Sequence, residues 1–144
     1  MCLRNKEWAF KEGIVIRTFI KQVTNLMIKF SDHNGVQIAE VNDAEFQISE
    51  VQDAVDLLGD LYFNNCSSII LNECNLHPDF FKLPTGLAGE VLQKFSNYSS
   101  RLVIIGDFTK YTSKSLQDFI RECNRGNRVF FVSNHDEAYT KLKK

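Results

Sequence analysis

The chain has 144 residues, of which 44% are hydrophobic, 12% aromatic and 24% charged, with 2 prolines and 7 glycines. Its length is near the usual size of one compact domain, and its composition excludes disordered, collagenous and low-complexity chains. The 17 Lys and Arg residues nearly balance the 18 Asp and Glu residues, so we expect no general attraction to nucleic acid or to an anionic membrane.

The first 26 residues differ from the rest in charge and in pattern. They carry five basic and two acidic residues, a net charge of +3, which leaves −4 on residues 27–144 because the whole chain carries −1. Apolar residues from Ile16 to Met27 fit helical spacing, whereas residues 14–16 would suit a strand. We interpret residues 1–26 as a disordered or loosely packed leader, Met27 as a candidate natural start, and residues 27–144 as one α/β domain.

No stretch of the sequence has the composition of a membrane segment. The longest apolar runs, such as residues 13–16 and 67–71, are far shorter than the ~20 residues that a bilayer span needs. Arg17 and Lys21 interrupt any signal-peptide core. We therefore expect a cytoplasmic protein without a membrane partner.

The predicted domain begins with a β-hairpin. Alternating runs at residues 27–30 and 36–41 flank a polar segment that ends in Asn34-Gly35, a pair typical of a tight turn between strands. Residues 45–48 form a short third run. We expect three strands here, the first two antiparallel.

A helix is predicted over residues 51–62, where apolar side chains recur at helical spacing. Ser49 and Gln52, three positions apart, have the pattern of a capping box at its start. Asn64-Asn65 marks its end.

Strands and helices alternate through the rest of the chain. Short continuous apolar runs are typical of strands that are buried on both faces, and they occur at residues 68–71, 101–105 and 128–132. Helical spacing follows each of them, at residues 85–95, 116–123 and 138–142. Gly126 is a fitting stop for the second of these helices, and Asn134 with Glu137 resembles a capping box for the last.

This alternation predicts an α/β fold. Parallel strands joined by right-handed helical crossovers form a single-layer sheet, and the N-terminal hairpin adds an antiparallel edge, so the sheet is mixed. An edge at residues 27–30 leaves a homodimer open.

The cysteines do not predict a disulfide framework or a metal site. Cys2, Cys66, Cys74 and Cys123 show no Cys-x-x-Cys spacing, and an apolar strand separates the middle two. Cys74 and His77 form a lone Cys-x-x-His pair, whereas zinc needs two further ligands. We expect no metal and no cofactor.

Ligands of open α/β sheets gather outside the carboxyl ends of the parallel strands. An acid, two imidazoles and a thiol on this rim would support acid–base or nucleophilic chemistry. The best candidates are Asp107, Glu73 and His77, with Lys110 facing an anionic ligand. The polar residues that follow the three predicted strands are Glu73, Cys74, His77, Asp79 and Thr85; Asp107, Lys110, Tyr111, Thr112 and Ser113; and Ser133, Asn134 and His135.

A plainer interpretation stands beside this one. Helix caps and turns use the same residue types: His77 precedes Pro78, where a turn is expected, and Asp107 either caps a loop or contacts a ligand. The phosphate-binding, dinucleotide-binding, serine-hydrolase and metalloprotease signatures are all missing from the sequence. The balance favours a protein that is not an enzyme.

The segment from Thr85 to Gly89 suggests a contact with a partner. Gly86 and Gly89, with Ala88 between them, let the helix start lie close to the sheet or to another molecule. The Thr85 hydroxyl falls where free N–H groups and the helix dipole favour negative charge, so a phosphate there would act as a switch. The alternative is that Thr85 is an N-cap and that the glycines serve packing.

Four stretches of the sequence are similar to one bacterial family, the domain of unknown function 4180. They are residues 51–58, 75–81, 85–95 and 105–120. The resemblance extends from about residue 27 to 142 and leaves out residues 1–26. It implies a bacterial origin and no particular activity.

More distantly, the element order and the Thr85-Gly-Leu-Ala-Gly helix start are similar to STAS domains (sulfate transporter and anti-sigma factor antagonist). In that family, phosphorylation of a Ser or Thr at the start of such a helix switches partner binding, and Thr85 falls at that position. The antagonists usually carry Asp-Ser before the Gly, whereas Pro84-Thr85 stands here.

Two hypotheses follow. The first is a non-enzymatic, STAS-like regulatory module that binds a protein partner through Thr85, Gly86, Leu87 and Gly89. The second is a small-molecule site or weak enzyme at the strand ends that uses Asp107, Glu73 and His77, with Lys110 as an anion contact.

Overall fold

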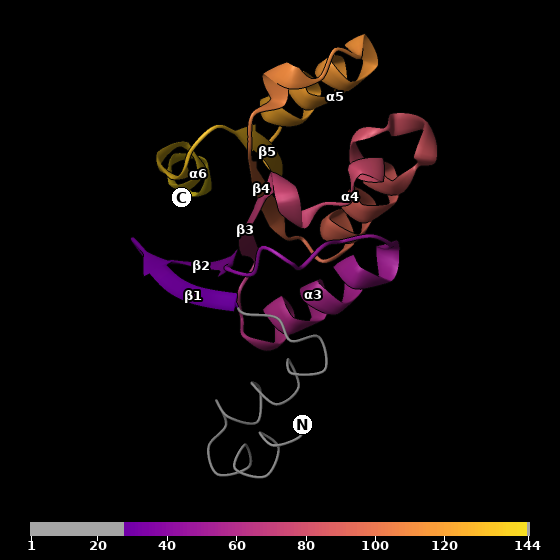
Figure 1. Cartoon of the computed structure of the whole chain (residues 1–144). Coiled ribbons are helices and arrows are strands. Elements are labelled where there is room, and N and C mark those ends of the chain that lie inside the picture. The colour runs from indigo at the N-terminus through magenta and orange to yellow at the C-terminus, as the bar shows by residue number, and fades with distance from the viewer. Residues whose placement is uncertain (1–27, 144) are drawn as a thin grey trace.

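The computed structural model describes residues 28–143, which form a five-stranded mixed sheet with helices on both faces (Figure 1). The strands lie in chain order, β1-β2-β3-β4-β5, and only the β1–β2 pair is antiparallel. The predicted fold class is confirmed. The predicted leader lies outside the described residues. Within residues 28–143, no helix is long and apolar enough to span a bilayer.

The hairpin is longer than its apolar pattern suggested. β1 (Ile28–His33) and β2 (Val36–Val41) pair along their full length, so the turn is only Asn34-Gly35. Both turn residues have positive φ, 57° and 86°, as a two-residue turn between twisted strands requires.

The third run was wrongly predicted as a strand. Ile48 makes a single bridge to Leu76, and the rest of residues 42–49 is irregular apart from a turn at 44–45. The predicted cap is also displaced by one residue. Glu50 is the N-cap, and Asp53 completes the capping box by accepting from the Ser49 and Glu50 N–H groups (2.9 and 3.2 Å). The helix itself, α3 (Val51–Phe63), is confirmed, and Asn64 caps its end.

The parallel part of the sheet follows the predicted runs closely. Its strands are β3 (Ser68–Asn72), β4 (Arg101–Ile105) and β5 (Val129–Val132), and the helices that follow them are α4 (Leu87–Asn97), α5 (Lys114–Arg125) and α6 (His135–Leu142). Gly126 caps α5 and Asn134 caps α6, as expected. The segment between β3 and α4 contains three short 3-10 helices, Glu73–Asn75, Pro78–Phe81 and Leu83–Thr85.

The sheet buries apolar side chains on both faces. Helices α3, α4 and α5, which connect the parallel strands, cover one face over a large core that includes Leu58, Val91 and Phe95. Among residues 28–143, α6 is the one helix on the other face (Figure 1), where Ala138 and Leu142 are fully buried.

Polar contacts from three strands fasten α6 to its face. The Arg101 guanidinium on β4 donates to the carbonyl oxygens of Lys141 and Leu142, which are free because the helix ends there. At the other end, His135 Nε2 lies 2.6 Å from Glu40 Oε2 on β2. Tyr139 stacks on His33 of β1, with ring centroids 4.3 Å apart.

The two edges of the sheet differ. At the β5 edge, Phe131 N–H donates to Asn124 Oδ1 (2.7 Å) and Asn124 Nδ2 donates to the Phe131 carbonyl oxygen (3.3 Å), so a side chain from α5 occupies main-chain groups that a further strand would need. β1 forms the opposite edge, where we predicted it. A homodimer through that edge stays a prediction.

Candidate functional site

The carboxyl ends of β3, β4 and β5 lie side by side. Asn72 is in register with Ile105, and Ile105 with Val132, so the segments after these residues share one rim. This is where open α/β sheets bind ligands. All the rim residues that we singled out in the sequence come from these segments.

Glu73 forms a largely buried charged cluster on the rim. Its side chain is 18% exposed, and Oε2 lies 2.7 Å from Lys110 Nζ. The Tyr111 hydroxyl donates to the same oxygen, and the Tyr111 ring stacks on Phe81 with centroids 4.9 Å apart. Burial, together with the Glu73 carboxylate, raises the pKa of Tyr111. Lys110 is therefore paired within the chain instead of facing an anionic ligand alone.

Gly106 makes room for this cluster. A Cβ atom at Gly106 would lie 2.7 Å from both Cβ and Oε1 of Glu73 and 3.1 Å from Phe108 Cζ. Real Cβ atoms do not approach so closely, and the lack of a side chain at the end of β4 is therefore what lets Glu73 lie against the backbone.

Asp107 acts as a cap. Its Oδ1 accepts from the Thr109 N–H (3.1 Å) and the Thr109 hydroxyl (2.6 Å), at the start of the short helix Phe108–Lys110. These hydrogen bonds, that from the hydroxyl first, lower the pKa of the Asp107 carboxyl. Its other oxygen has no hydrogen-bond partner among the described residues.

His77 is a cap as well. Its Nδ1 accepts from the Asp79 N–H (3.0 Å), which starts the short helix Pro78–Phe81. Among residues 28–143, no hydrogen bond or ion pair joins any two of Asp107, Glu73 and His77. The three side chains that we grouped as a possible acid–base set are each held by near neighbours.

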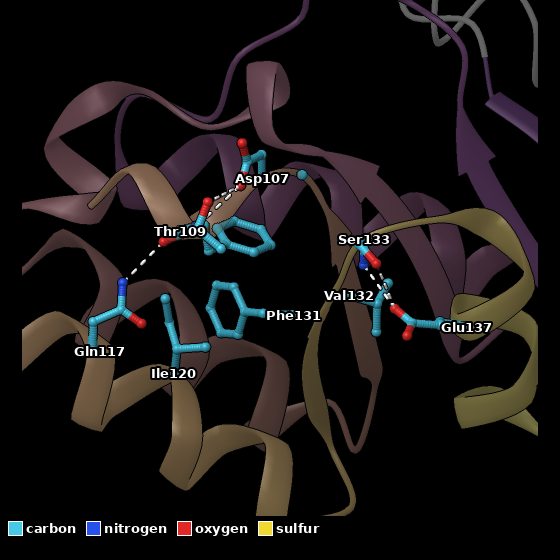
Figure 2. A pocket seen from close by; sticks show the side chains of 10 residues that line it. Asp107, Thr109, Gln117, Ile120, Phe131, Val132, Ser133 and Glu137 are labelled. Carbon is cyan, nitrogen blue, oxygen red and sulfur yellow. Dashed lines mark hydrogen bonds between the residues drawn. The ribbon is translucent and has the colours of Figure 1, made fainter. Parts of the chain in front are cut away.

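A pocket opens between the ends of β4 and β5, with a volume of about 590 Å³ (Figure 2). Asp107 lines it, whereas Glu73 and His77 do not. Gln117 on α5 supports its wall by donating to the carbonyl oxygens of Phe108 (2.9 Å) and Tyr111 (2.8 Å). The complete lining is Gly106, Asp107, Phe108, Thr109, Gln117, Ile120, Phe131, Val132, Ser133 and Glu137.

Glu137 is the lining residue whose role the sequence analysis missed. We read it only as part of a capping box, but its Oε1 accepts from the Ser133 N–H (2.8 Å) and hydroxyl (3.0 Å). These bonds, that from the N–H first, lower the pKa of Glu137. Its position one helical turn after the end of β5 was the available signal, since the first turn of a helix that follows a strand reaches the same rim.

The turn before α4 does not start the helix at Thr85. Gly86 is the N-cap, with φ +81°, and the exposed Thr85 hydroxyl donates toward the carbonyl oxygens of Asp79 (2.7 Å) and Lys82 (2.8 Å). Leu87 N–H donates to the same hydroxyl (3.3 Å). The Leu87 side chain is in the core, and Gly89 is exposed with no atom within 4 Å of a Cβ position. Packing within the described chain therefore does not explain Gly89.

A second hollow, of about 490 Å³, lies at the opposite end of the strands. Tyr62 and Phe63 at the end of α3 line it and are 76% and 71% exposed, and Tyr98 after α4 completes its aromatic lining. Exposed aromatic residues are enriched at protein interfaces. Tyr62 fits the apolar spacing of α3, so that pattern does not reveal its exposure.

The described cysteines are free: Cys66 is buried, Cys123 is half-buried and Cys74 is exposed. Burial raises the pKa of both the Cys66 and Cys123 thiols. No group of three or more potential metal ligands occurs within residues 28–143.

We expect NMR titration to place the pKa of Asp107 below 3.8 and that of Glu137 below 4.5, their ordinary values. A carboxyl whose pKa is lower in the folded than in the unfolded protein stabilises the fold above its unfolded-state pKa, and this contribution disappears as the pH falls through the folded-state pKa. Stability should therefore fall as the pH drops below about 4, and less steeply in Asp107→Asn and Glu137→Gln. A value at or above the ordinary one for either group contradicts the hydrogen bonds described.

The fold and rim define a mixed α/β domain with a pocket at its parallel strand ends. The family described as a domain of unknown function (DUF4180) matches residues 33–142, which is 110 of the 144 residues, and the chain belongs to this family. A search of curated proteins finds no match to the chain.

Proposed function

We propose that this domain is a non-enzymatic, STAS-like regulatory module that binds a protein partner through the turn before α4. The interaction surface consists of the exposed residues Thr85 and Gly89 and the half-buried Gly86. Within the described part of the chain, Asp107, Glu73 and His77 each bond to other residues and not to one another. Acid–base catalysis needs such groups within hydrogen-bond reach of the same proton, so this arrangement favours a binding role.

Gly89 carries the proposal. A glycine within a helix is up to about 1 kcal/mol less favourable than alanine, and nothing within the described chain lies where a Cβ would be. A partner backbone that approaches α4 closely would give the missing side chain a purpose, as glycine permits such an approach.

Thr85 would control that contact. A phosphoryl group on its exposed oxygen removes the donor that now bonds the carbonyl oxygens of Asp79 and Lys82. The added negative charge would lie next to the N-terminus of α4, where the helix dipole favours it. The turn would then change shape and charge together without a change in the core.

The test is co-purification of the tagged chain from its source cells, followed by native mass spectrometry. We expect a stoichiometric protein partner that is lost with Thr85→Glu and reduced with Gly89→Ala. Thr85→Val separates loss of the hydroxyl from gain of charge. Both threonine variants should stay folded, with stability lowered by about 1 kcal/mol for the lost hydrogen bond.

Gly59→Ala is the matched control for Gly89→Ala. Gly59 is exposed on α3 and likewise has no atom within 4 Å of a Cβ position, so both variants should be as stable as the parent or up to about 1 kcal/mol more stable. Partner recovery that is unaffected by Thr85→Glu and Gly89→Ala would count against this surface. Loss of the partner with Phe63→Ser instead would place the interface at the hollow lined by Tyr62, Phe63 and Tyr98.

A second candidate function is small-molecule binding at the strand ends. The observation in its favour is the pocket of about 590 Å³, within the usual range for ligand sites, whose lining combines apolar walls with a few polar groups. A bare domain that carries a tightly held small mass in the same experiment would favour this function.

A further inference from the structure

The pocket between β4 and β5 has aromatic and aliphatic walls. Phe108 and Phe131 meet edge to face with centroids 5.2 Å apart, and Ile120 of α5 lines the pocket with them (Figure 2). Ring surfaces of this kind attract an organic cation through the ring quadrupole as well as through apolar contact.

The charged residues of the lining are all acidic. Asp107 and Glu137 come from the segments after β4 and β5, and Figure 2 shows them at the upper and right borders of the pocket. One oxygen of Asp107 accepts two hydrogen bonds from Thr109, and one oxygen of Glu137 accepts two from Ser133. The other oxygen has no hydrogen-bond partner among residues 28–143 and can accept from a ligand.

Two lysines outside the lining, Lys110 and Lys141, offset part of this negative charge through their electrostatic effect on Asp107 and Glu137 respectively. Lys110 Nζ is 2.7 Å from Glu73 Oε2. Lys141 Nζ lies 5.4 Å from the centroid of the Phe130 ring, and Lys141 lines an adjoining hollow together with Glu137. No Lys, Arg or His is among the ten residues that line the pocket itself.

We propose that this pocket binds a small organic ammonium ion, with the protonated nitrogen at the carboxylates of Asp107 and Glu137 and the apolar body against Phe108, Ile120 and Phe131. The inference deepens the second candidate function, ligand binding at this rim, and is independent of the partner surface near Thr85. The pocket would disfavour carboxylates and phosphates, because both charged residues of its lining are negative and the two lysines lie outside it.

The test is a titration of the isotope-labelled full chain with benzylammonium, followed by amide NMR. We expect saturable shifts at Thr109, Phe131 and Ser133 with a Kd of millimolar order. Benzyl alcohol, which has the same ring without the charge, should bind about 10- to 25-fold more weakly, as expected for loss of two exposed ion pairs. Phenylacetate should not bind.

Two variants test the carboxylates without removing the hydrogen bonds that they accept. Asp107→Asn and Glu137→Gln keep an acceptor oxygen for Thr109 and Ser133, and each should weaken benzylammonium binding by about three- to fivefold while leaving benzyl alcohol unaffected. Asp56→Asn is the control, because Asp56 is an exposed acid on α3 outside the pocket lining. It should leave the affinity unchanged.

The possible outcomes distinguish an ammonium site from ligand binding of any kind in this pocket. Equal binding of benzylammonium and benzyl alcohol, indifferent to both variants, would overturn the ammonium site while leaving an apolar ligand pocket in place. The absence of saturable shifts with all three probes would overturn the ammonium site and count against ligand binding at this rim. Preferred binding of phenylacetate would overturn the charge argument.

Discussion

Leu142→Ala should lower the free energy of unfolding by about 2–5 kcal/mol, the usual range for truncation of a buried leucine. Leu142 is fully buried on the sheet face that α6 covers in the described part of the chain, beside Ile70, Val103 and Phe130. Because small domains are stable by only about 5–15 kcal/mol, this single change removes a large share of the total. Urea unfolding followed by circular dichroism measures the difference.

Removal of residues 135–144 should have a still larger effect. It exposes the whole apolar face, and we expect a protein that binds a hydrophobic dye and no longer unfolds cooperatively. Thr140→Ala is the control on the same helix, because Thr140 is exposed and its hydroxyl donates to the Asp136 carbonyl oxygen of the same helix. Its effect should stay within about 0.5 kcal/mol. A truncated chain that keeps its parent stability would show that the face is covered in some other way.

Gly106→Ala should destabilise the protein by about 1–3 kcal/mol, as overpacking of a tight site does. The new Cβ would lie 2.7 Å from Glu73 Cβ, an atom next to the backbone that cannot swing aside. Glu73 must therefore shift, and its contacts with Lys110 and Tyr111 shift with it. The pKa of Tyr111, which Glu73 and burial raise, should fall toward its ordinary value of 10.0.

Urea unfolding and a titration of ring-labelled tyrosine measure these two effects. Gly59→Ala serves again as the matched control, since a Cβ at Gly59 meets no atom within 4 Å. It should leave the Tyr111 titration unchanged. A Gly106→Ala protein with parent stability and an unchanged Tyr111 pKa would show that the close contact with Glu73 is not maintained in solution.

The regular elements of this fold could be predicted because local pattern and burial agree. The continuous apolar runs at β3, β4 and β5 are buried on both sides, and the amphipathic helices between them leave parallel pairing as the simple solution. Asn34-Gly35 also located the hairpin turn, because few residues adopt positive φ in succession.

The irregular segments could not be predicted in the same way. Residues 45–48 alternate as a strand does, but only Ile48 finds a partner, Leu76, which lies beyond the next strand. Asn75 donates to the carbonyl oxygens of Asp43 and Phe46 (both 2.9 Å) and so holds this turn from 29 or more residues away. Contacts of this range leave no local signal in a sequence.

The candidate site was predicted in position but not in detail. The strand-end rule brought Asp107 and Glu73 to the right rim, yet whether a carboxylate faces a ligand or a neighbouring N–H depends on backbone angles that residue types do not reveal. One Asp107 oxygen accepts from the Thr109 N–H and hydroxyl, and the other has no hydrogen-bond partner among residues 28–143. Glu137 was overlooked because its spacing from Asn134 has an ordinary explanation as a capping box.

The strictly sequential order of the strands bears on how the chain is made. Each strand from β2 onward pairs with the one synthesised just before it, so the sheet can grow as the polypeptide leaves the ribosome. The sheet face that α6 covers forms differently. Strands β2, β3, β4 and β5 contribute its apolar side chains, and all four are translated before α6. Until that last helix emerges, the nascent sheet displays a broad hydrophobic surface of the kind that chaperones shield.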